Sequence, residues 1–170
     1  MRSMPVTRRG FAARMASVLS LIGVTDGAAL PVGAPQTSQG QGNGVRKLNY
    51  EGKPADGTQM ITPLIVHNGL IYISGQGAND AGSIETADIA SHTTKVMNNV
   101  KQLVEAGGGT MDSILQLTVY LANLDHYDGM NRVFKTYFPH GGPARTTVSV
   151  AGVPGRSLLE INCIAAVTRS

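Results

Sequence analysis

Two runs near the C-terminal end of the chain constrain its fold more than any other feature. Residues 145–150 and 160–163 alternate polar and apolar side chains with the period of two that half-buried β-strands show. The turn-forming sequence Ala-Gly-Val-Pro-Gly lies between them, so we predict an antiparallel hairpin. The polar positions include Arg145 and Glu160, which such a hairpin would bring close together.

This pair of charges has two interpretations. One is a salt bridge on a solvated sheet face, because cross-strand charge pairs are common. The other is a binding site, since an arginine can hold a planar carboxylate with two parallel hydrogen bonds and a carboxylate can orient a water molecule and carry its proton. Together, Arg145 and Glu160 suggest a site for a small carboxylate-bearing substrate that water attacks.

Four segments carry a resemblance to a known family. In chain order they are Ile73-Ser-Gly-Gln, Met130-Asn-Arg-Val-Phe-Lys-Thr-Tyr-Phe, Pro143-Ala-Arg-Thr-Thr-Val and Leu159-Glu-Ile-Asn-Cys-Ile-Ala-Ala. Over residues 47–168 the chain resembles the Rid/YjgF superfamily, the reactive intermediate deaminases. The resemblance implies an α+β fold, a single chorismate-mutase-like (YjgF-type) domain with one mixed sheet and two helices packed on one face. It also implies a homotrimer with ligand clefts between subunits.

The activity implied by the resemblance is hydrolytic deamination of reactive 2-imino acids to 2-keto acids and ammonia, without a cofactor or a metal. Arg145 would bind the substrate carboxylate and Glu160 would hold the attacking water. Further hydrogen bonds would come from the Ser74-Gly75 segment and the Thr147 backbone, while Asn131 matches a polar helix residue of the family's cleft. Taken singly, Ser74-Gly75, Thr147 and Asn131 are better explained as a strand end, strand filler and a solvated helix position; it is their joint occurrence in the family's order that favours the site.

One departure from the family affects the expected activity. Deaminases of this family usually carry a tyrosine that closes over the ligand, but residues 58–63 contain none and Ile61 stands near its place. Two other functions therefore stay open. The cleft could bind small carboxylates without turnover, or the chain could be an endoribonuclease and translation inhibitor, activities also attributed to members of the family.

The charge distribution argues against a general nucleic-acid binder. The chain carries a net charge of +3, but four arginines precede the first acidic residue, Asp26. Without residues 1–34, ten basic and ten acidic residues remain. A neutral domain without a Lys/Arg run lacks the electrostatic footprint expected for RNA binding.

The first 34 residues read as a targeting segment. Thr7-Arg-Arg-Gly-Phe11 precedes a modestly apolar stretch and then small residues, which resembles a twin-arginine export signal and favours a periplasmic or secreted protein. A mitochondrial presequence is the alternative, because the segment is rich in arginine and serine. Residues 35–45 read as a flexible linker, and residues 46–170 as the Rid/YjgF-like domain. No segment of the mature protein is predicted to span a membrane.

The remaining pattern predicts the order of elements. We expect strands at 47–50, 64–67, 70–74 and 115–124, with Asn68-Gly69 as a hairpin turn, and helices at 86–106 and 127–137, the second capped by Asp125. His92 falls on the polar side of the first helix. The single cysteine, Cys163, reads as a core residue, and the four histidines lack the spacing of metal ligands, so no metal site is expected.

Overall fold

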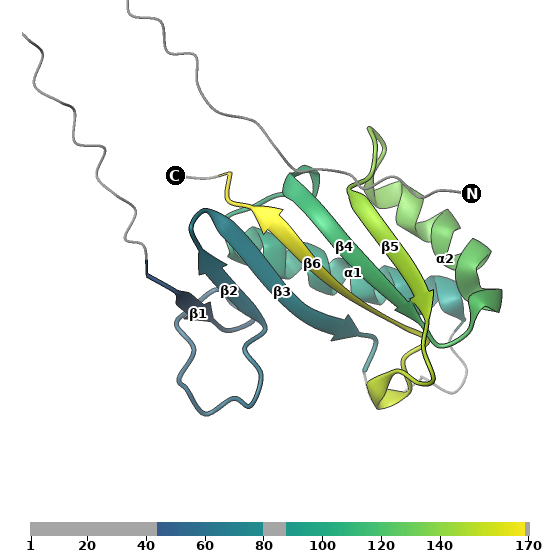
Figure 1. Cartoon of the computed structure of the whole chain (residues 1–170), viewed down its shortest axis with the longest axis horizontal. Coiled ribbons are helices and arrows are strands. Elements are labelled where there is room, and N and C mark those ends of the chain that lie inside the picture. The colour runs from purple at the N-terminus through teal and green to yellow at the C-terminus, as the bar shows by residue number, and fades with distance from the viewer. Residues whose placement is uncertain (1–43, 80–87, 169–170) are drawn as a thin grey trace, which may run out of the picture. The chain divides into compact units, whose positions relative to one another are not determined.

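The computed structural model describes residues 44–79 and 88–168. These residues form one mixed six-stranded sheet with two α-helices packed on the same face, as predicted (Figure 1). The predicted export signal and most of the linker lie outside the described residues. The elements are β1 (Arg46–Leu48), β2 (Leu64–His67), β3 (Leu70–Gly77), α1 (Ile89–Ala106), β4 (Ile114–Leu121), α2 (Tyr127–Phe134), β5 (Ala144–Ser149) and β6 (Leu159–Ala166).

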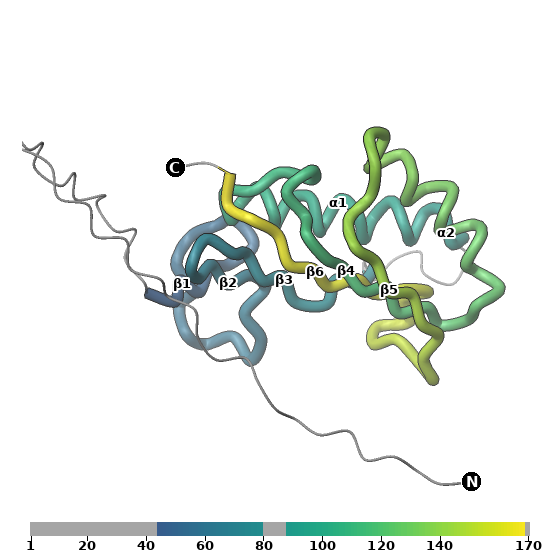
Figure 2. Tube along the Cα trace, turned by 45° about the horizontal axis from the view of Figure 1, so that its top comes forward, coloured from purple at the N-terminus to yellow at the C-terminus, as the bar shows by residue number. Residues whose placement is uncertain are grey.

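The strand order of the sheet is β1-β2-β3-β6-β4-β5, and Figure 2 shows the strands side by side in this order. The predicted hairpin of the last two strands is wrong. β5 lies at the edge and pairs in parallel with β4, whereas β6 inserts between β3 and β4 and is antiparallel to both. The segment β4-α2-β5 is thus a strand-helix-strand unit, whose intervening helix allows parallel pairing.

The hairpin of β2 and β3 confirms the Asn-Gly turn. Asn68 and Gly69 both have positive φ values, 50° and 74°, which is the backbone conformation of a two-residue type I′ turn. This turn sets the register in which Leu64 faces Ile73. Leu64 and Ile73 are consequently both buried on the helix-covered side of the sheet.

Helix α1 covers the middle of the sheet with its apolar face. Its first turn is capped by Asp88, whose Oδ1 accepts a hydrogen bond of 2.8 Å from the Ser91 N–H, and this bond is the main cause of the lowered pKa of Asp88. The helix ends at Ala106, as predicted, and the glycine run at 107–109 follows it. Its buried residues are His92, Thr93, Val96, Met97, Val100, Leu103 and Val104.

The burial of His92 corrects the prediction that it lies on the polar side. Its side chain is only 2% exposed, and its Nδ1 accepts a hydrogen bond of 3.1 Å from the N–H of Leu158, just before β6. Burial lowers the pKa of His92; Asp88 opposes this shift and His126 adds to it. His92 therefore ties α1 to the segment that leads into β6.

Helix α2 starts after a single 3₁₀ turn at 124–126, and Asp125 is not its cap. Instead, Asn123 Oδ1 accepts a hydrogen bond of 3.0 Å from the Asp125 N–H. A second 3₁₀ turn continues the helix to Tyr137, whose hydroxyl lies 2.9 Å from Asn98 Oδ1 on α1. These contacts hold the two helices together on one side of the sheet.

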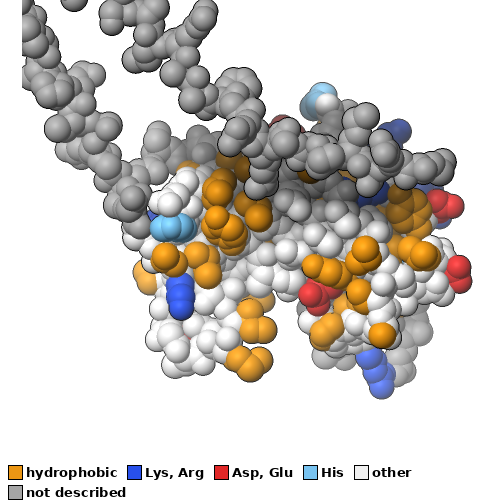
Figure 3. Space-filling model, in the orientation of Figure 1, with side chains coloured by type: hydrophobic (Ala, Val, Ile, Leu, Met, Phe, Trp, Pro, Cys, Tyr) orange, Lys and Arg blue, Asp and Glu red, His pale blue; other side chains and the backbone are white. Residues whose placement is uncertain are grey.

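The core between sheet and helices is mostly aliphatic, with Met97, Met130, Phe134 and Phe138 added, and Cys163 belongs to it as predicted. Burial raises the pKa of the Cys163 thiol to about 12, so the thiol stays protonated. In the described part of the chain, neither helix has the length and hydropathy needed to cross a bilayer. The other face of the sheet carries no helix and is turned toward the viewer in Figure 3, where polar side chains lie among scattered hydrophobic ones.

Candidate functional site

The Ser74-Gly75 segment forms a bulge near the end of β3. Ile73 pairs with Cys163 and Gln76 pairs with Ile161, so Ser74 and Gly75 together oppose one residue of β6, Asn162. A bulge re-aims the backbone and leaves part of it unpaired. The structure thus gives these two predicted site residues a special backbone geometry at one end of the sheet.

Gln76 holds this bulge in place. Its side chain is 4% exposed, and Nε2 lies 3.1 Å from each of three acceptors, the carbonyl oxygens of Ser74 and Gly75 and the hydroxyl of Ser74. A buried amide with several partners costs little to bury and fixes the loop around it. In the sequence, Gln76 is only the last residue of the Ile73-Ser-Gly-Gln motif, and no local pattern indicates that its side chain holds the bulge.

Glu160 brings its carboxylate to the bulge, on the open face of the sheet. It faces Gly77 of β3 on one side and Tyr120 of β4 on the other. An added Cβ on Gly75 would overlap Oε1 of Glu160 and stand 2.6 Å from its Cδ. Only a glycine therefore leaves room for the carboxylate, which gives Gly75 a physical reason to be there.

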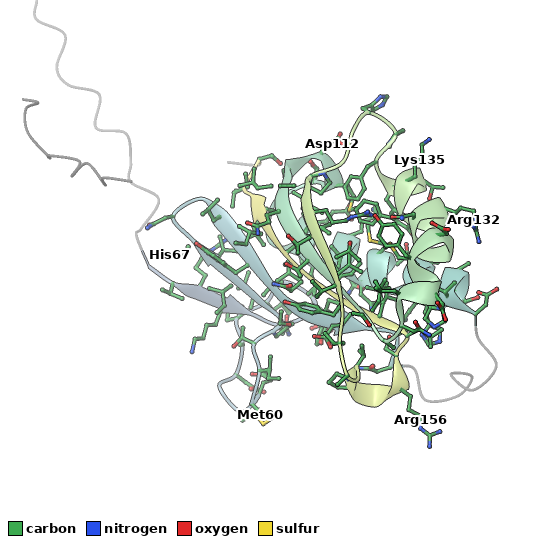
Figure 4. The ribbon with its side chains drawn as sticks, turned by 45° about the vertical axis from the view of Figure 1, so that its right-hand side comes forward. Met60, His67, Asp112, Arg132, Lys135 and Arg156 are labelled. Atoms are coloured by element: carbon green, nitrogen blue, oxygen red, sulfur yellow. The ribbon has the colours of Figure 1, made fainter. Side chains whose placement is uncertain are left out.

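A hollow of about 150 Å³ lies beside this carboxylate. It is lined by Tyr120, Val150, Gly152, Val153, Pro154 and Glu160. Two loops lie at this end of the sheet, 49–63 with Met60 and 150–158 with Arg156 (Figure 4). The surface is indented between the two loops (Figure 3). The hollow presents the carboxylate of Glu160 and the phenol of Tyr120 among apolar walls. Its size suits a small molecule together with a water.

Arg145 lies elsewhere, on the helix-covered side of the edge strand β5. It faces the buried Leu117 of β4, and its guanidinium carbon lies 4.6 Å from the ring centre of Phe134 and 5.9 Å from that of Tyr127, both on α2. These distances are those of cation–π contacts. Within residues 44–79 and 88–168 no carboxylate pairs with this half-buried guanidinium, so its hydrogen-bonding edge is available to an anion.

Two more predicted site residues belong to the Arg145 side. Thr147 lies two positions along β5 and faces Val119, and its buried hydroxyl oxygen has no hydrogen-bond partner in the described chain. Asn131 is four residues after Tyr127 and three before Phe134, which places it on the same face of α2 as the two rings. Arg145, Thr147 and Asn131 thus form one group, the arginine half-site.

The expected proximity of Arg145 and Glu160 is wrong within one chain. Their strands lie on either side of β4, and Arg145 and Cys163 both pair with Leu117 of that strand. Because Glu160 is three residues from Cys163 along β6, the Cα atoms of Arg145 and Glu160 are about 14 Å apart by strand geometry. Arg145 pairs with Leu117 and Glu160 with Tyr120, and residues three apart on a strand point to opposite faces, so the two side chains do so as well. Glu160, Ser74 and Gly75 make a second group, the glutamate half-site.

The segment where the family carries its tyrosine is exposed. Met60 is 94% exposed and Ile61 62% exposed at the tip of the loop before β2. Figure 4 shows Met60 at the outer end of this loop. Neither residue supplies a hydroxyl, so the departure noted in the sequence stands.

Comparison with known proteins shows the family to which the chain belongs. A family model described as Endoribonuclease L-PSP matches residues 58–167, more than half of the chain. The chain belongs to this family, the Rid/YjgF (L-PSP) family. The match starts within the loop before β2 and ends just after β6, so it covers both half-sites.

Three similar proteins illustrate the range of the family. The chain is 36% identical to a RutC family protein of Pyrococcus horikoshii over 97 residues, 56% of the chain and 77% of that protein. It is 28% identical to the 2-iminobutanoate/2-iminopropanoate deaminase of Rattus norvegicus over 123 residues, 71% of the chain and 90% of that protein. It also resembles the crystal structure of E. coli TdcF with bound serine, with a TM-score of 0.59 and 29% identity over 66% of the chain and 90% of TdcF.

Proposed function

We propose that this Rid/YjgF protein hydrolyses 2-imino acids to 2-keto acids and ammonia. The observation that supports the proposal most is the half-buried Arg145 guanidinium, held over the rings of Tyr127 and Phe134 and without a carboxylate partner in the described residues. A cation held in this way binds a planar carboxylate through two parallel hydrogen bonds. The substrate therefore carries a carboxylate next to its reacting centre.

Glu160 supplies the second element of the chemistry. Its carboxylate lies in a hollow that also holds space for a water, beside the Ser74-Gly75 bulge. In the proposed reaction the water gives a proton to Glu160 as its oxygen bonds to the imine carbon, and the carbon–nitrogen π electrons move to nitrogen. Glu160 then passes this proton to nitrogen, which gives a neutral carbinolamine. It next takes the hydroxyl proton of this adduct and gives it to the amino nitrogen, so the carbon–nitrogen bond breaks, ammonia leaves and the keto group forms.

The two half-sites act together only between subunits. In a 2-imino acid the carboxylate carbon is bonded directly to the imine carbon, so Arg145 and Glu160 must converge on adjacent atoms. Within one chain they lie on opposite sheet faces about 14 Å apart at Cα. We therefore propose a homotrimer in which the arginine half-site of one subunit meets the glutamate half-site of its neighbour.

A coupled assay tests this function. An amino-acid oxidase generates 2-iminopropanoate or 2-iminobutanoate in place, and 2-keto acid release is measured above the enzyme-free rate. We expect Arg145→Ala to lower kcat/KM by about 100-fold, the value of a charge-assisted hydrogen-bonded pair. Glu160→Gln should lower kcat by at least about 100-fold and keep 2-ketobutyrate binding. Wild-type rates in both variants would refute the mechanism.

The same proteins separate the alternatives. A wild type that binds 2-ketobutyrate through Arg145 but hydrolyses no imine would be a carboxylate-binding module. RNA cleavage by purified protein that disappears in Arg145→Ala would favour a nuclease, in keeping with the description of the family model. The first result would contradict the deaminase proposal. The second would contradict it if the same protein hydrolysed no imine.

A further inference from the structure

Tyr120 is the residue of the glutamate half-site that the sequence analysis did not assign. It lies on β4 directly opposite Glu160 of β6 in an antiparallel pair, so both side chains project from the open face of the sheet. Tyr120 and Glu160 line the same hollow, whose other walls are Val150, Gly152, Val153 and Pro154. Among these six residues, only Tyr120 and Glu160 have polar side chains.

The phenol of Tyr120 is free to act on a molecule in the hollow. Throughout residues 44–79 and 88–168, its hydroxyl makes no hydrogen bond, and its side chain is partly exposed. A tyrosine on a sheet face normally finds a partner for its hydroxyl when it is covered. A subunit packed over this face would take water away from the hydroxyl, so a partner inside the hollow is required.

The position of Glu160 defines which partner that is. Its carboxylate leans across the strand toward Gly75 of β3, away from Tyr120 on β4. Both residues line the space of about 150 Å³, which holds more than one water-sized molecule. A water in it can donate one hydrogen to the carboxylate and the other to the phenol oxygen, which leaves its lone pair for the imine carbon.

We propose that Tyr120 is a catalytic residue that, with Glu160, holds the attacking water at the open face of the sheet. This inference rests on the proposed function. The phenol oxygen accepts a hydrogen bond from the water and exchanges no proton, while Glu160 takes the water proton and returns it to nitrogen. Tyr120 acts at the reacting carbon, whereas Arg145 acts at the substrate carboxylate.

The test compares two tyrosines of the same sheet face. Tyr120→Phe removes the hydroxyl from the hollow, and Tyr72→Phe removes one from β3, outside the hollow. Steady-state rates with 2-iminobutanoate, calorimetric binding of 2-ketobutyrate and thermal unfolding are measured for both. We expect Tyr120→Phe to lower kcat about tenfold, the value of one hydrogen bond, with unchanged 2-ketobutyrate affinity. Tyr72→Phe should match the wild type.

Each outcome decides the inference. An unchanged kcat in Tyr120→Phe, with an active wild type, overturns the role of Tyr120 and leaves the deaminase function standing. An equal loss in Tyr72→Phe, or weakened 2-ketobutyrate binding in place of a lower kcat, also overturns it. If the wild type hydrolyses no imine, the proposed function fails first, and this result is distinguished by the activity of the wild type alone.

Discussion

The carboxylate of Glu160 lies directly against the backbone of Gly75 across the bulge of β3, and an alanine Cβ there would stand 2.6 Å from the Glu160 Cδ. Gly75→Ala should therefore push the carboxylate out of its place. We expect kcat for imine hydrolysis to fall at least about 100-fold, as for loss of a general base. Binding of 2-ketobutyrate, measured by calorimetry, should depend on Arg145 and change little.

A matched control for this substitution is Gly44→Ala. Gly44 has an ordinary backbone conformation and no atom within 4 Å of an added Cβ. This variant should keep the full rate. Full activity in Gly75→Ala would show that the carboxylate position next to Gly75 is irrelevant to turnover.

The aromatic rings of α2 position the Arg145 guanidinium. Phe134→Leu removes the nearer ring, 4.6 Å from the guanidinium carbon. Cation–π contacts are worth about 0.5–2 kcal/mol, so we expect KM for the imine to rise about 2- to 30-fold, with a smaller effect on kcat. Phe134→Tyr retains a ring face and should keep the wild-type KM. If KM in the two variants instead changed in proportion to their loss of unfolding free energy, the ring would not position Arg145.

Ser157 joins the end of β3 to the start of β6. Its buried hydroxyl accepts a hydrogen bond of 2.9 Å from the Ala78 N–H and donates one of 2.6 Å to the Leu159 carbonyl. Ser157→Ala leaves the Ala78 N–H without a partner, so the free energy of unfolding should fall by about 1–3 kcal/mol in urea titrations. The exposed Ser149→Ala should change it by less than about 0.5 kcal/mol. Equal stability of both variants would contradict this account.

His92 makes the fold sensitive to acid. Burial lowers its pKa below the ordinary 6.5, so the unfolded chain binds a proton more readily than the folded one. Its contribution to stability is therefore complete above pH 6.5 and is lost as pH falls below that value. Protonation would also occupy the Nδ1 that accepts the Leu158 N–H.

The variant His92→Asn isolates this effect. Its Oδ1 replaces Nδ1 as an acceptor but does not titrate. The fall in unfolding free energy between pH 7.5 and about 5.5 should be smaller in this variant than in the wild type, with Asp88 and His126 unchanged nearby. Parallel pH profiles of the two proteins would show that His92 does not contribute.

The sequence predicted the faces of the strands better than their neighbours. Alternation places Arg145 with Thr147, and Glu160 with Asn162, because a period of two depends only on the strand's own backbone. Strand partners depend on distant residues. Residues 151–155 read as a hairpin turn, but Gly155 and Arg156 adopt positive φ values, and the chain continues into the middle of the sheet. The order strand, helix, strand over residues 114–149 was the signal for a parallel edge.

The sequence names candidate residues for the site, but neither their division into two half-sites nor the contributions of Gln76 and Tyr120. The motifs named Ser74, Gly75, Arg145 and Glu160, and the structure gives each a distinct environment. The burial of His92 was not predicted, because it depends on a hydrogen bond from the Leu158 N–H, and these two residues are 66 positions apart in the sequence. The ring contacts of Arg145 and the hollow beside Tyr120 likewise arise from packing that no local pattern encodes.

The most direct test of a site shared between subunits is complementation of two inactive variants. Arg145→Ala and Glu160→Gln are co-expressed with different affinity tags, and oligomers that carry both tags are assayed for 2-iminobutanoate hydrolysis. In every trimer that contains both variants, one of the three interfaces joins an intact Arg145 to an intact Glu160. We predict that the doubly tagged trimers regain about a third of wild-type activity. Mixed oligomers as inactive as either parent would contradict the shared site.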